Sequence, residues 1–296
     1  MRAEGSGHAE GMRSRATVGK PTALGPAISN RGGSAYRRDV RPVSRELAEE
    51  FDGPVLDATT WVPAYLPVWS STAASAATYT IDNSCLTLTI PPAQGLWCAG
   101  DHEPPLRVSG IQSGAWSGPV GSPLGQQRYR EGLAVREAQD RFEGWLPFSG
   151  RVAVRCAMTL SPRSMAALWL SGFEDDPAQE QCGELCVVEV FGKDLGPEPS
   201  AEVGVGIKPF RDPALRDDFA APRLPIDVSE PHTYAVDWDA SVAVFSVDGR
   251  EVRRCAQPPT YPMQVMVAVF DFPAWSTGDD DHLVPALEVD WIRGSG

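Results

Sequence analysis

The stretch GELCVVEVFG, residues 183–192, places Glu184 and Glu189 five residues apart in an otherwise apolar run. Its valines and cysteine favour a β-strand over a helix. In a regular strand the side chains of Glu184 and Glu189 point to opposite faces. One extra residue between Cys186 and Glu189, a β-bulge, would turn Glu184, Cys186 and Glu189 to the same face. The alternative is an edge strand with two solvated glutamates.

The composition indicates a globular, all-β protein. Hydrophobic residues make up 42% of the 296 residues, and 9 Trp and 10 Phe are ample for a sizeable core. The 28 Gly and 27 Pro favour turns and short strands over long helices. The length fits one large domain or two small ones, and sandwiches of about 250 residues commonly form a single domain.

The charge is unevenly distributed along the chain. The net charge is −13, yet residues 1–45 hold nine Lys and Arg against three acidic residues and are rich in Gly and Ser without periodicity. We therefore expect a disordered tail over residues 1–45 and a single domain over residues 46–296. The acidic domain argues against nucleic acid or an anionic membrane as the partner and leaves a neutral polymer such as a polysaccharide.

Cysteine usage and targeting signals give few constraints. The six cysteines are too few and too scattered for a disulfide framework, although a few bridges are compatible with their number. Cys182 and Cys186 are spaced C-x-x-x-C without a nearby histidine, which disfavours a zinc site. The sequence shows neither a membrane span nor the apolar core of a standard signal peptide. These features favour the cytoplasm, although an extracellular polysaccharide would suggest secretion.

Short apolar runs separated by Gly, Pro, Asp and Asn predict strands, without long helices, from residue 46 onward. Asp248-Gly249 and Asp82-Asn83 are hairpin signals between such runs. The pattern predicts a two-sheet antiparallel β-sandwich of the jelly-roll type. Residues 93–145 and 208–230 lack clear strand signals, so we expect them to be long loops that line a cleft. The predicted strands are 77–81, 86–90, 150–158, 166–171, 184–191, 201–207, 232–237, 242–247, 264–270 and 286–293.

Five motifs follow one another in a recognisable order: EFDG at 50–53, SGRVAVR at 149–155, AALWL at 166–170, HTYAVDW at 232–238 and LEVDWIR at 287–293. In residue type and order they resemble glycoside hydrolase family sixteen, the laminarinase-like and lichenase-like β-glucanases of the concanavalin-A-like fold. The resemblance extends from Phe51 to Arg293. It implies a jelly-roll sandwich that hydrolyses a β-glucan by double displacement with retention of configuration.

The resemblance also implies roles for individual residues. GELCVVE is similar to the E-x-D-x-x-E active-site strand of the family, which implies Glu184 as the nucleophile and Glu189 as the acid/base. Cys186 occupies the place of the aspartate, and a thiol is a weak donor and a poor acceptor, so we expect slower catalysis. Met165 stands where relatives often place a sugar-stacking tryptophan, and Ala268 where a polar residue is frequent. The alternative is a non-catalytic or weakened carbohydrate-binding protein on the same fold.

The remaining candidates are aromatic or acidic. Five tryptophans are candidates for substrate binding, with core packing as the alternative for each: Trp169, Trp275, Trp145, Trp116 and Trp97. The resemblance places Asp290 at a position that can join a structural calcium site away from the cleft, the alternative being a hydrogen-bonded strand aspartate. We expect no required cofactor, a polysaccharide or oligosaccharide as the partner, and a monomer.

Three further patterns carry less weight. We expect His102 and His282 at the surface and His232 in a structural role. GVGIK at residues 204–208 faintly resembles a phosphate-binding loop but lacks the following helix and the full motif. The G-x-S-x-G nucleophile elbow is absent from the sequence.

Overall fold

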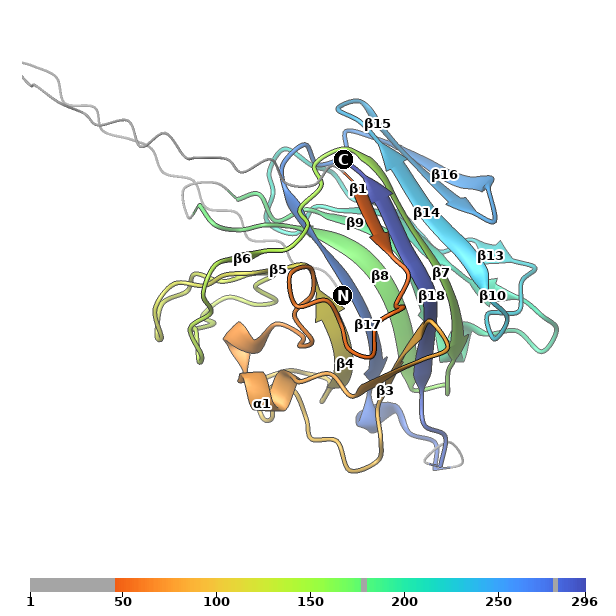
Figure 1. Ribbon diagram of the computed structural model, residues 1–296, viewed down its shortest axis with the longest axis horizontal. Helices are drawn as coiled ribbons and strands as arrows, with labels where there is room; N and C mark the ends of the chain where they lie inside the picture. Colours follow the sequence, from red (N-terminus) through yellow and green to blue (C-terminus); the bar gives the residue numbers. More distant parts are fainter. Residues whose placement is uncertain (1–45, 177–179, 279–281) are drawn as a thin grey trace, which may run out of the picture. The chain divides into compact units, whose positions relative to one another are not determined.

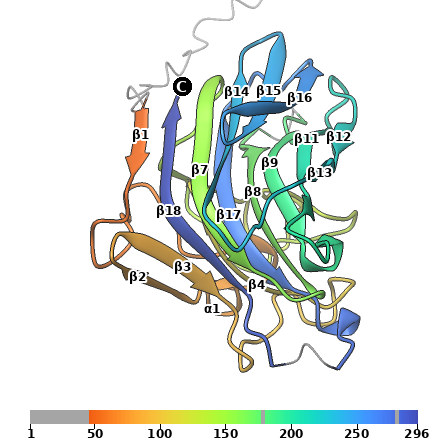
Figure 2. The ribbon, with the colours of Figure 1, turned by 90° about the vertical axis from the view of Figure 1, so that its right-hand side faces the viewer.

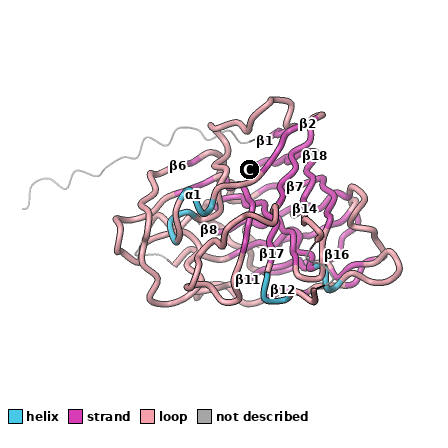
Figure 3. The backbone as a smooth tube through the Cα atoms, turned by 90° about the horizontal axis from the view of Figure 1, so that it is seen from below, coloured by secondary structure: helices cyan, strands magenta, loops and turns pink. Residues whose placement is uncertain are grey.

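The computed structural model describes residues 46–176, 180–278 and 282–296. The tail predicted over residues 1–45 lies outside the described residues. Strands and loops make up most of this part of the chain, and the helices are single turns (Figure 3). They comprise α1 (Thr72–Ser75), η1 (Pro67–Trp69), η2 (Gly192–Asp194) and η3 (Pro273–Trp275). Within the described ranges, none of these helices has the length and hydropathy that a membrane span needs.

Two antiparallel sheets form a sandwich, which confirms the predicted fold class. Figures 1 and 2 show them as two layers, with β7, β14 and β18 in one and β8, β9 and β17 in the other. The first sheet has the order β16-β15-β14-β7-β18-β3-β2, with β1 also pairing β18. Its strands are β1 (Glu46–Glu49), β2 (Tyr79–Asp82), β3 (Cys85–Thr89), β7 (Gly150–Thr159), β14 (His232–Trp238), β15 (Val242–Val247), β16 (Arg250–Ala256) and β18 (Ala286–Ser295).

The second sheet carries the candidate site. In the described residues it has six strands in the order β12-β11-β9-β8-β17-β4. They are β4 (Arg107–Gln112), β8 (Ser164–Gly172), β9 (Glu184–Phe191), β11 (Gly204–Lys208), β12 (Asp218–Ala220) and β17 (Met263–Asp271). Two short pairs lie beside the sheets, β5 (Gly114–Ala115) with β6 (Phe142–Glu143) and β10 (Ala201–Glu202) with β13 (Arg223–Leu224).

The core between the two sheets follows the strand period of two. On β8, Ala166, Leu168 and Leu170 face the first sheet and join one large apolar cluster. The alternate residues Ala167 and Trp169 face the other way and belong to a second cluster. β17 alternates in the same manner. The period of two therefore separates a core face from an outer face on each central strand.

The outer face of the second sheet is covered as well. Every residue of β8 and β17 is buried, although only one face of each strand packs against the first sheet. Segments between residues 65 and 135 supply the cover, including Leu66, Trp69, Trp97 and Val135. Figure 1 shows α1 and the loops around β5 and β6 beside β4 and β8. The pocket described below lies between this cover and the sheet.

Most predicted strands are present, with two instructive differences. Asp248 and Gly249 both have positive φ values, as a two-residue hairpin turn requires, and they join β15 to β16. The hairpin near Asp82 is also present, but its turn residues are Asn83 and Ser84. Residues 93–145, expected to be loops, contain β4, whose sequence RVSGIQ mixes polar and small residues. The strand is stabilised by its backbone hydrogen bonds to β17, and the propensities of its residues do not predict it.

Candidate active site

A β-bulge in β9 sets the orientation of the candidate catalytic residues. Leu168 of β8 pairs with Val188, and the next residue, Trp169, pairs with Cys186, so Val187 has no partner on β8. The register on the opposite neighbour, β11, shifts at the same place. Both Val187 and Val188 consequently enter the core cluster. The bulge expected from the sequence is confirmed.

The bulge brings Glu184, Cys186 and Glu189 to one face of β9, where all three line the same pocket. A regular strand would have sent Glu189 into the core. The pocket has a volume of about 230 Å³. Apart from these three residues it is lined by Tyr65, Leu66, Trp97, His102, Leu106, Gln127, Arg128, Tyr129, Met165, Ala167, Trp169, Cys182, Lys208, Phe210, Arg211, Phe270 and Phe272.

The stretch GVGIK is strand β11, and its glycines permit the bulge opposite. Gly206 pairs with Cys186 and has a φ of +134°, a conformation that L side chains rarely adopt. A Cβ atom there would lie 2.2 Å from the carbonyl oxygen of Asp218. The glycines that make GVGIK resemble a phosphate-binding loop instead allow close packing between neighbouring strands. The strand ends at Lys208, whose side chain lines the pocket.

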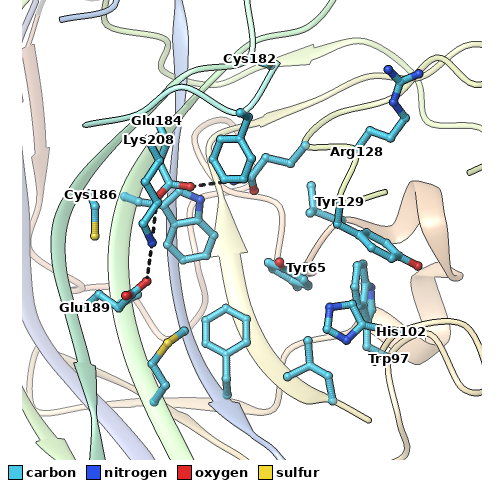
Figure 4. A pocket seen from close by; sticks show the side chains of 18 of the residues that line it. Tyr65, Trp97, His102, Arg128, Tyr129, Cys182, Glu184, Cys186, Glu189 and Lys208 are labelled. Carbon is cyan, nitrogen blue, oxygen red and sulfur yellow. Dashed lines mark hydrogen bonds and ion pairs between the residues drawn. The ribbon is translucent and has the colours of Figure 1, made fainter. Parts of the chain in front are cut away.

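Glu184 is buried in the wall of the pocket. The residue is 6% exposed, and its Oε2 accepts a hydrogen bond of 3.2 Å from Nε2 of Gln127 (Figure 4). Burial raises the pKa of Glu184 to about 7, the nearby Glu189 adds to that rise, and Lys208 opposes it. Near neutral pH this carboxyl group therefore exists in both protonation states.

Lys208 joins the two glutamates. Its Nζ lies 3.0 Å from Oε2 of Glu189 and 3.9 Å from Oε1 of Glu184, and Figure 4 shows the ammonium between them. The ammonium also lies 4.2 Å from the centre of the Phe219 ring. Burial would lower the pKa of Lys208, but the two carboxylates outweigh it and the pKa is raised. Lys208 is therefore a charged member of the site, which the sequence analysis missed.

Cys186 does not replace the aspartate that its position implies. The residue is 1% exposed, and its thiol donates to the carbonyl oxygen of Gly204 at 3.6 Å. The thiol is thus directed to the backbone of β11. Burial, followed by the charges of Glu189 and Glu184, raises the pKa of the thiol well above its ordinary value. Cys186 is therefore neutral and adds no negative charge to the pair.

Two of the five candidate tryptophans line the pocket. Trp169 reaches it from β8, and Trp97 reaches it from the covering loops, where its ring packs edge-on against Tyr65. The Nε1 atoms of both indoles are buried without a hydrogen-bond partner in the described structure. Oε1 of Gln127, another lining residue, is in the same condition. A buried polar atom without a partner is costly, so these three groups are candidates for a hydrogen bond to a ligand in the pocket.

The other three tryptophans do not line this pocket, and a role for them in substrate binding stays a prediction. Trp145 is 2% exposed within the core cluster, where its ring approaches Gly294. Trp116 lines a smaller pocket of about 80 Å³. Trp275 is 37% exposed and stacks on Phe272, whose own side chain lines the main pocket. Its ring therefore lies next to the site but does not line it.

Asp290 accepts a hydrogen bond of 2.9 Å from Nε of Arg155 on β7, so a cation already neutralises it. Within the described ranges no group of three or more His, Cys, Asp and Glu residues could hold a metal ion. The cysteines, including Cys182 and Cys186, are free. A structural calcium ion at Asp290 stays a prediction, and it would have to draw on backbone oxygens.

The histidines divide between the site and the surface. His102, expected at the surface, lines the pocket, because its ring packs against Trp97 and Tyr129 and its Nδ1 lies 2.8 Å from the carbonyl oxygen of Pro104. His232 is structural, since its two ring nitrogens contact Asp248 and the backbone of Asp227. His282 is exposed.

Gln127, Tyr65 and Tyr129 also escaped the sequence analysis. They lie in irregular segments without a motif, and they reach the pocket because these segments cover the outer face of the sheet. Lys208 had a weak signal. It ends a short strand that contains two glycines, a composition typical of close backbone packing.

The two antiparallel sheets place the protein among the jelly-roll sandwiches. Residues 148–293 match the glycosyl hydrolases family 16. The chain thus contains a glycoside hydrolase family 16 domain, which implies a carbohydrate substrate. No match is found among curated proteins.

Solved structures show the same fold. A GlcNAcα1-4Gal-releasing endo-β-galactosidase from Clostridium perfringens is similar, with a TM-score of 0.68 and 22% identity, over 84% of this chain and 60% of that one. The chain thus spans less than two thirds of the length of that structure. A laminarinase from a Flavobacterium species has a TM-score of 0.57 and 16% identity, over 84% and 99%. A structure described with endo-acting O-glycanases of the human gut microbiota has a TM-score of 0.55 and 17% identity, over 84% and 98%.

Proposed function

We propose that this protein is a retaining glycoside hydrolase that cleaves a β-linked glycan by double displacement. Glu184 is the nucleophile and Glu189 the acid/base. The observation that carries the proposal is the bulge at Val187, which turns both carboxyl groups into one pocket. A retaining mechanism needs two carboxyl groups close together on either side of the scissile bond.

The chemistry proceeds in two steps. Carboxylate Glu184 attacks the anomeric carbon while Glu189 donates its proton to the departing glycosidic oxygen, which forms a covalent glycosyl-enzyme. Glu189 then removes a proton from water, which attacks the same carbon and releases Glu184. Burial of Glu184 excludes bulk water from the nucleophile, and the indole rings of Trp97 and Trp169 line the pocket where a sugar would bind.

The glycan is the finer part of the proposal. The sequence motifs favour a β-glucan, whereas the similar structures include an endo-β-galactosidase and O-glycanases as well as a laminarinase. A β-1,3-glucan or mixed-linkage glucan is our first candidate and a β-galactan the second. The apolar side chains Met165, Phe270 and Phe272 would meet the flat, apolar face of either sugar.

A second function has support from a specific observation. Cys186 is neutral where the family pattern has a carboxylate, and Lys208 pairs with the proposed acid/base. Both features weaken the catalytic pair without removing the pocket. The alternative is therefore a carbohydrate-binding protein in which turnover is weak or lost.

The test is reducing-sugar release by the full-length protein from laminarin, lichenan, xyloglucan, agarose and mucin O-glycans. We expect turnover on one of these, and a loss of about 10³-fold or more in Glu184→Gln and in Glu189→Gln. Glu288→Gln, an exposed glutamate on β18, is the matched control and should retain full activity.

The remaining outcomes separate the two functions. Turnover that first appears in Cys186→Asp would identify a weakened enzyme with an intact pocket. Glycan binding in calorimetry without turnover in any variant would establish the binding protein. An absence of both binding and turnover on the whole panel would overturn the proposal.

A further inference from the structure

Gln127 is the hydrogen-bond donor to the carboxyl group of Glu184 within the described ranges. Its Nε2 lies 3.2 Å from Oε2 of Glu184. Position 186, where the family pattern has an aspartate, holds a cysteine, and the thiol of Cys186 donates to the carbonyl oxygen of Gly204 instead. The donor to the proposed nucleophile therefore comes from a segment that covers the sheet, and not from the strand of Glu184 itself.

The backbone on either side of this amide is held by side chains from distant segments. The carbonyl oxygen of Gln126 accepts a hydrogen bond of 2.7 Å from Nε1 of Trp69. The N–H of Gln127 donates to Oε1 of Glu174 at 2.7 Å. The side chain of Gln126 also exchanges hydrogen bonds of 3.3 and 3.1 Å with the carbonyl oxygen and the N–H of Glu174. Glu174 thus binds two successive residues of this segment.

Arg211 extends the same arrangement to the next residue. Its guanidinium forms an ion pair with Oε2 of Glu174, and another of its nitrogens donates to the carbonyl oxygen of Arg128 at 2.8 Å. The side chains of Arg211 and Glu174 are 24% and 14% exposed, so the pair is largely shielded from solvent. One carboxylate thereby binds both a guanidinium and the backbone N–H of Gln127.

The backbone of Gln127 has a conformation that needs this support. Its φ is +45°, in the left-handed region that residues other than Gly, Asn and Asp rarely adopt. A side chain in this region is strained, and the conformation persists where the surrounding structure holds it. The hydrogen bonds from Glu174 and Arg211 to residues 127 and 128 supply that hold.

We propose that Gln127 is a positioning residue for Glu184: its amide, fixed in place through Glu174 and Arg211, holds the carboxyl group in one orientation and supplies the donor that position 186 lacks. An N–H donor also favours the ionised form of a carboxyl group, and a nucleophile needs that form. The catalytic consequence rests on the proposed function, whereas the effect of the amide on the ionisation of Glu184 does not.

Other groups that act on the ionisation of Glu184 surround it. Lys208 lies 3.9 Å away on β11, and Cys186 and Glu189 share the strand of Glu184. Burial, followed by the charge of Glu184, raises the pKa of Tyr65 in the covering segments. A substitution at position 127 leaves all of these side chains in the protein. The remaining ionisable residues that line the pocket are His102, Arg128, Tyr129, Cys182 and Arg211.

The test is a ¹³C NMR titration of the full-length protein labelled at the carboxyl carbon of glutamate. The resonance of Glu184 is identified by its loss in Glu184→Gln. Gln127→Met keeps the length of the side chain and removes the N–H donor. Because the carboxylate of Glu184 then loses a stabilising contact, we expect its titration midpoint to rise by about 1 pH unit.

A matched control and a second variant accompany this substitution. Gln257 is also a glutamine with a left-handed backbone, at a φ of +59°, but it is exposed and does not line the pocket. Gln257→Met should leave the midpoint of Glu184 unchanged. Gln127→Asn keeps a residue that the left-handed region tolerates and withdraws the amide from Glu184, so it should also raise the midpoint. Circular dichroism reports whether each variant folds.

Glu174→Gln tests whether the support acts through Gln127. The substitution removes the charge that binds Arg211 and loosens the segment that carries the amide. In a double-mutant cycle, the shift in the Glu184 midpoint caused by Glu174→Gln should be smaller in the Gln127→Met background than in the wild type. Equal shifts in the two backgrounds would overturn the role assigned to Glu174.

A Glu184 midpoint that is unchanged in both Gln127→Met and Gln127→Asn would overturn the proposal. This titration is performed without substrate, so its failure is distinguishable from a failure of the proposed function. Where the glycan panel gives turnover, kcat of Gln127→Met should fall by about 10-fold or more, with a smaller change in KM. The acidic limb of its kcat/KM profile should move to higher pH together with the midpoint. A wild-type kcat and pH profile in Gln127→Met would also overturn the proposal.

Discussion

The two faces of the second sheet differ in the residues that cover them and in how completely they are packed. On the core face, β8 and β17 present aliphatic residues in strict alternation, and these pack against the first sheet. On the outer face the same strands meet loops that come from far away in the sequence and leave a pocket. The core face is filled with apolar atoms, whereas the outer face has unpaired indole N–H groups and a partly buried lysine-glutamate cluster. One face of the sheet thus contributes to the stability of the fold, and the other face forms the wall of the candidate active site.

The bulge at Val187 is where the two faces meet. It inserts Val187 and Val188 side by side into the core and leaves Glu184 and Glu189 together in the pocket. An apolar contact on one face thus fixes the geometry of the charges on the other.

Inserting one alanine between Val188 and Glu189 should have the largest effect, because it changes the register that the bulge sets. Glu189 would turn toward the core, and burial of an uncompensated charge costs several kcal/mol. We expect the free energy of unfolding to fall by more than about 4 kcal/mol in a urea titration. Val187→Ala is the control, since it keeps the register and loses only buried methyl groups, at about 2 kcal/mol. An insertion variant as stable as Val187→Ala would contradict the role given to the register of β9.

Leu170→Ala tests the core face alone. Leu170 has no exposed surface and lies in the core cluster. Its truncation leaves a cavity and should lower the free energy of unfolding by about 2 to 5 kcal/mol. Turnover on the glycan found by the panel should stay that of the wild type. A lower turnover in the folded variant would show that the two faces are coupled at this position.

Glu184→Gln tests the outer face through pH. In the unfolded chain the ordinary pKa is 4.5, whereas burial raises the pKa of folded Glu184 to about 7. Between these values the unfolded state has lost a proton that the folded state keeps, so stability falls as the pH rises, and the loss is complete above about pH 7.

The glutamine is neutral at every pH. We therefore expect Glu184→Gln to be more stable than the wild type by up to roughly 3 kcal/mol at about pH 8, and equal to it at about pH 4. Urea unfolding at the two pH values measures the difference, with the exposed Glu288→Gln as reference. A gain that is the same at both pH values would mean that ionisation of Glu184 is not its source.

Trp169→Phe should have the smallest effect on stability. It keeps an aromatic ring but removes the indole N–H, which has no partner in the described structure. We expect a smaller loss of stability than for the adjacent Leu170→Ala. Affinity for the glycan found by the panel should fall about 10-fold, since one hydrogen bond contributes about 1 to 1.5 kcal/mol. Unchanged affinity in calorimetry would remove this N–H group from the binding site.

Much of the sandwich was predictable because its strands follow a local rule. β9 and β15 have the predicted bounds, β7 ends one residue later than predicted, and β8 and β17 are longer by one or two residues at each end. In a strand that separates a core from another environment, the residue types alternate with a period of two, and this alternation is visible in the sequence. β4 was missed because its sequence lacks this alternation and because its place at the sheet edge depends on pairing with β17.

The residues of the candidate site also divide into those that a local sequence pattern predicts and those that depend on distant segments. Glu184, Glu189 and the bulge between them lie within eight residues of one strand, so the spacing of charged and apolar residues was sufficient to predict them. Trp145 illustrates the opposite case. It stands in an irregular segment that suggested a cleft, yet its ring lies in the core near Gly294. The residues around Trp145 do not indicate which side of this segment packs against the core.

The sequence by itself determined the strand pattern, the pairing of two carboxyl groups in β9 and the resemblance to a carbohydrate-active family, because each is a relation between nearby residues or an ordered set of motifs. Only the tertiary structure decided that Lys208 contacts both glutamates and that Gln127, Trp97 and His102 complete the pocket. These contacts join residues of different strands and loops. Their physical basis is the packing of distant segments over one sheet, and the charges and burial that follow from that packing set the protonation of the site.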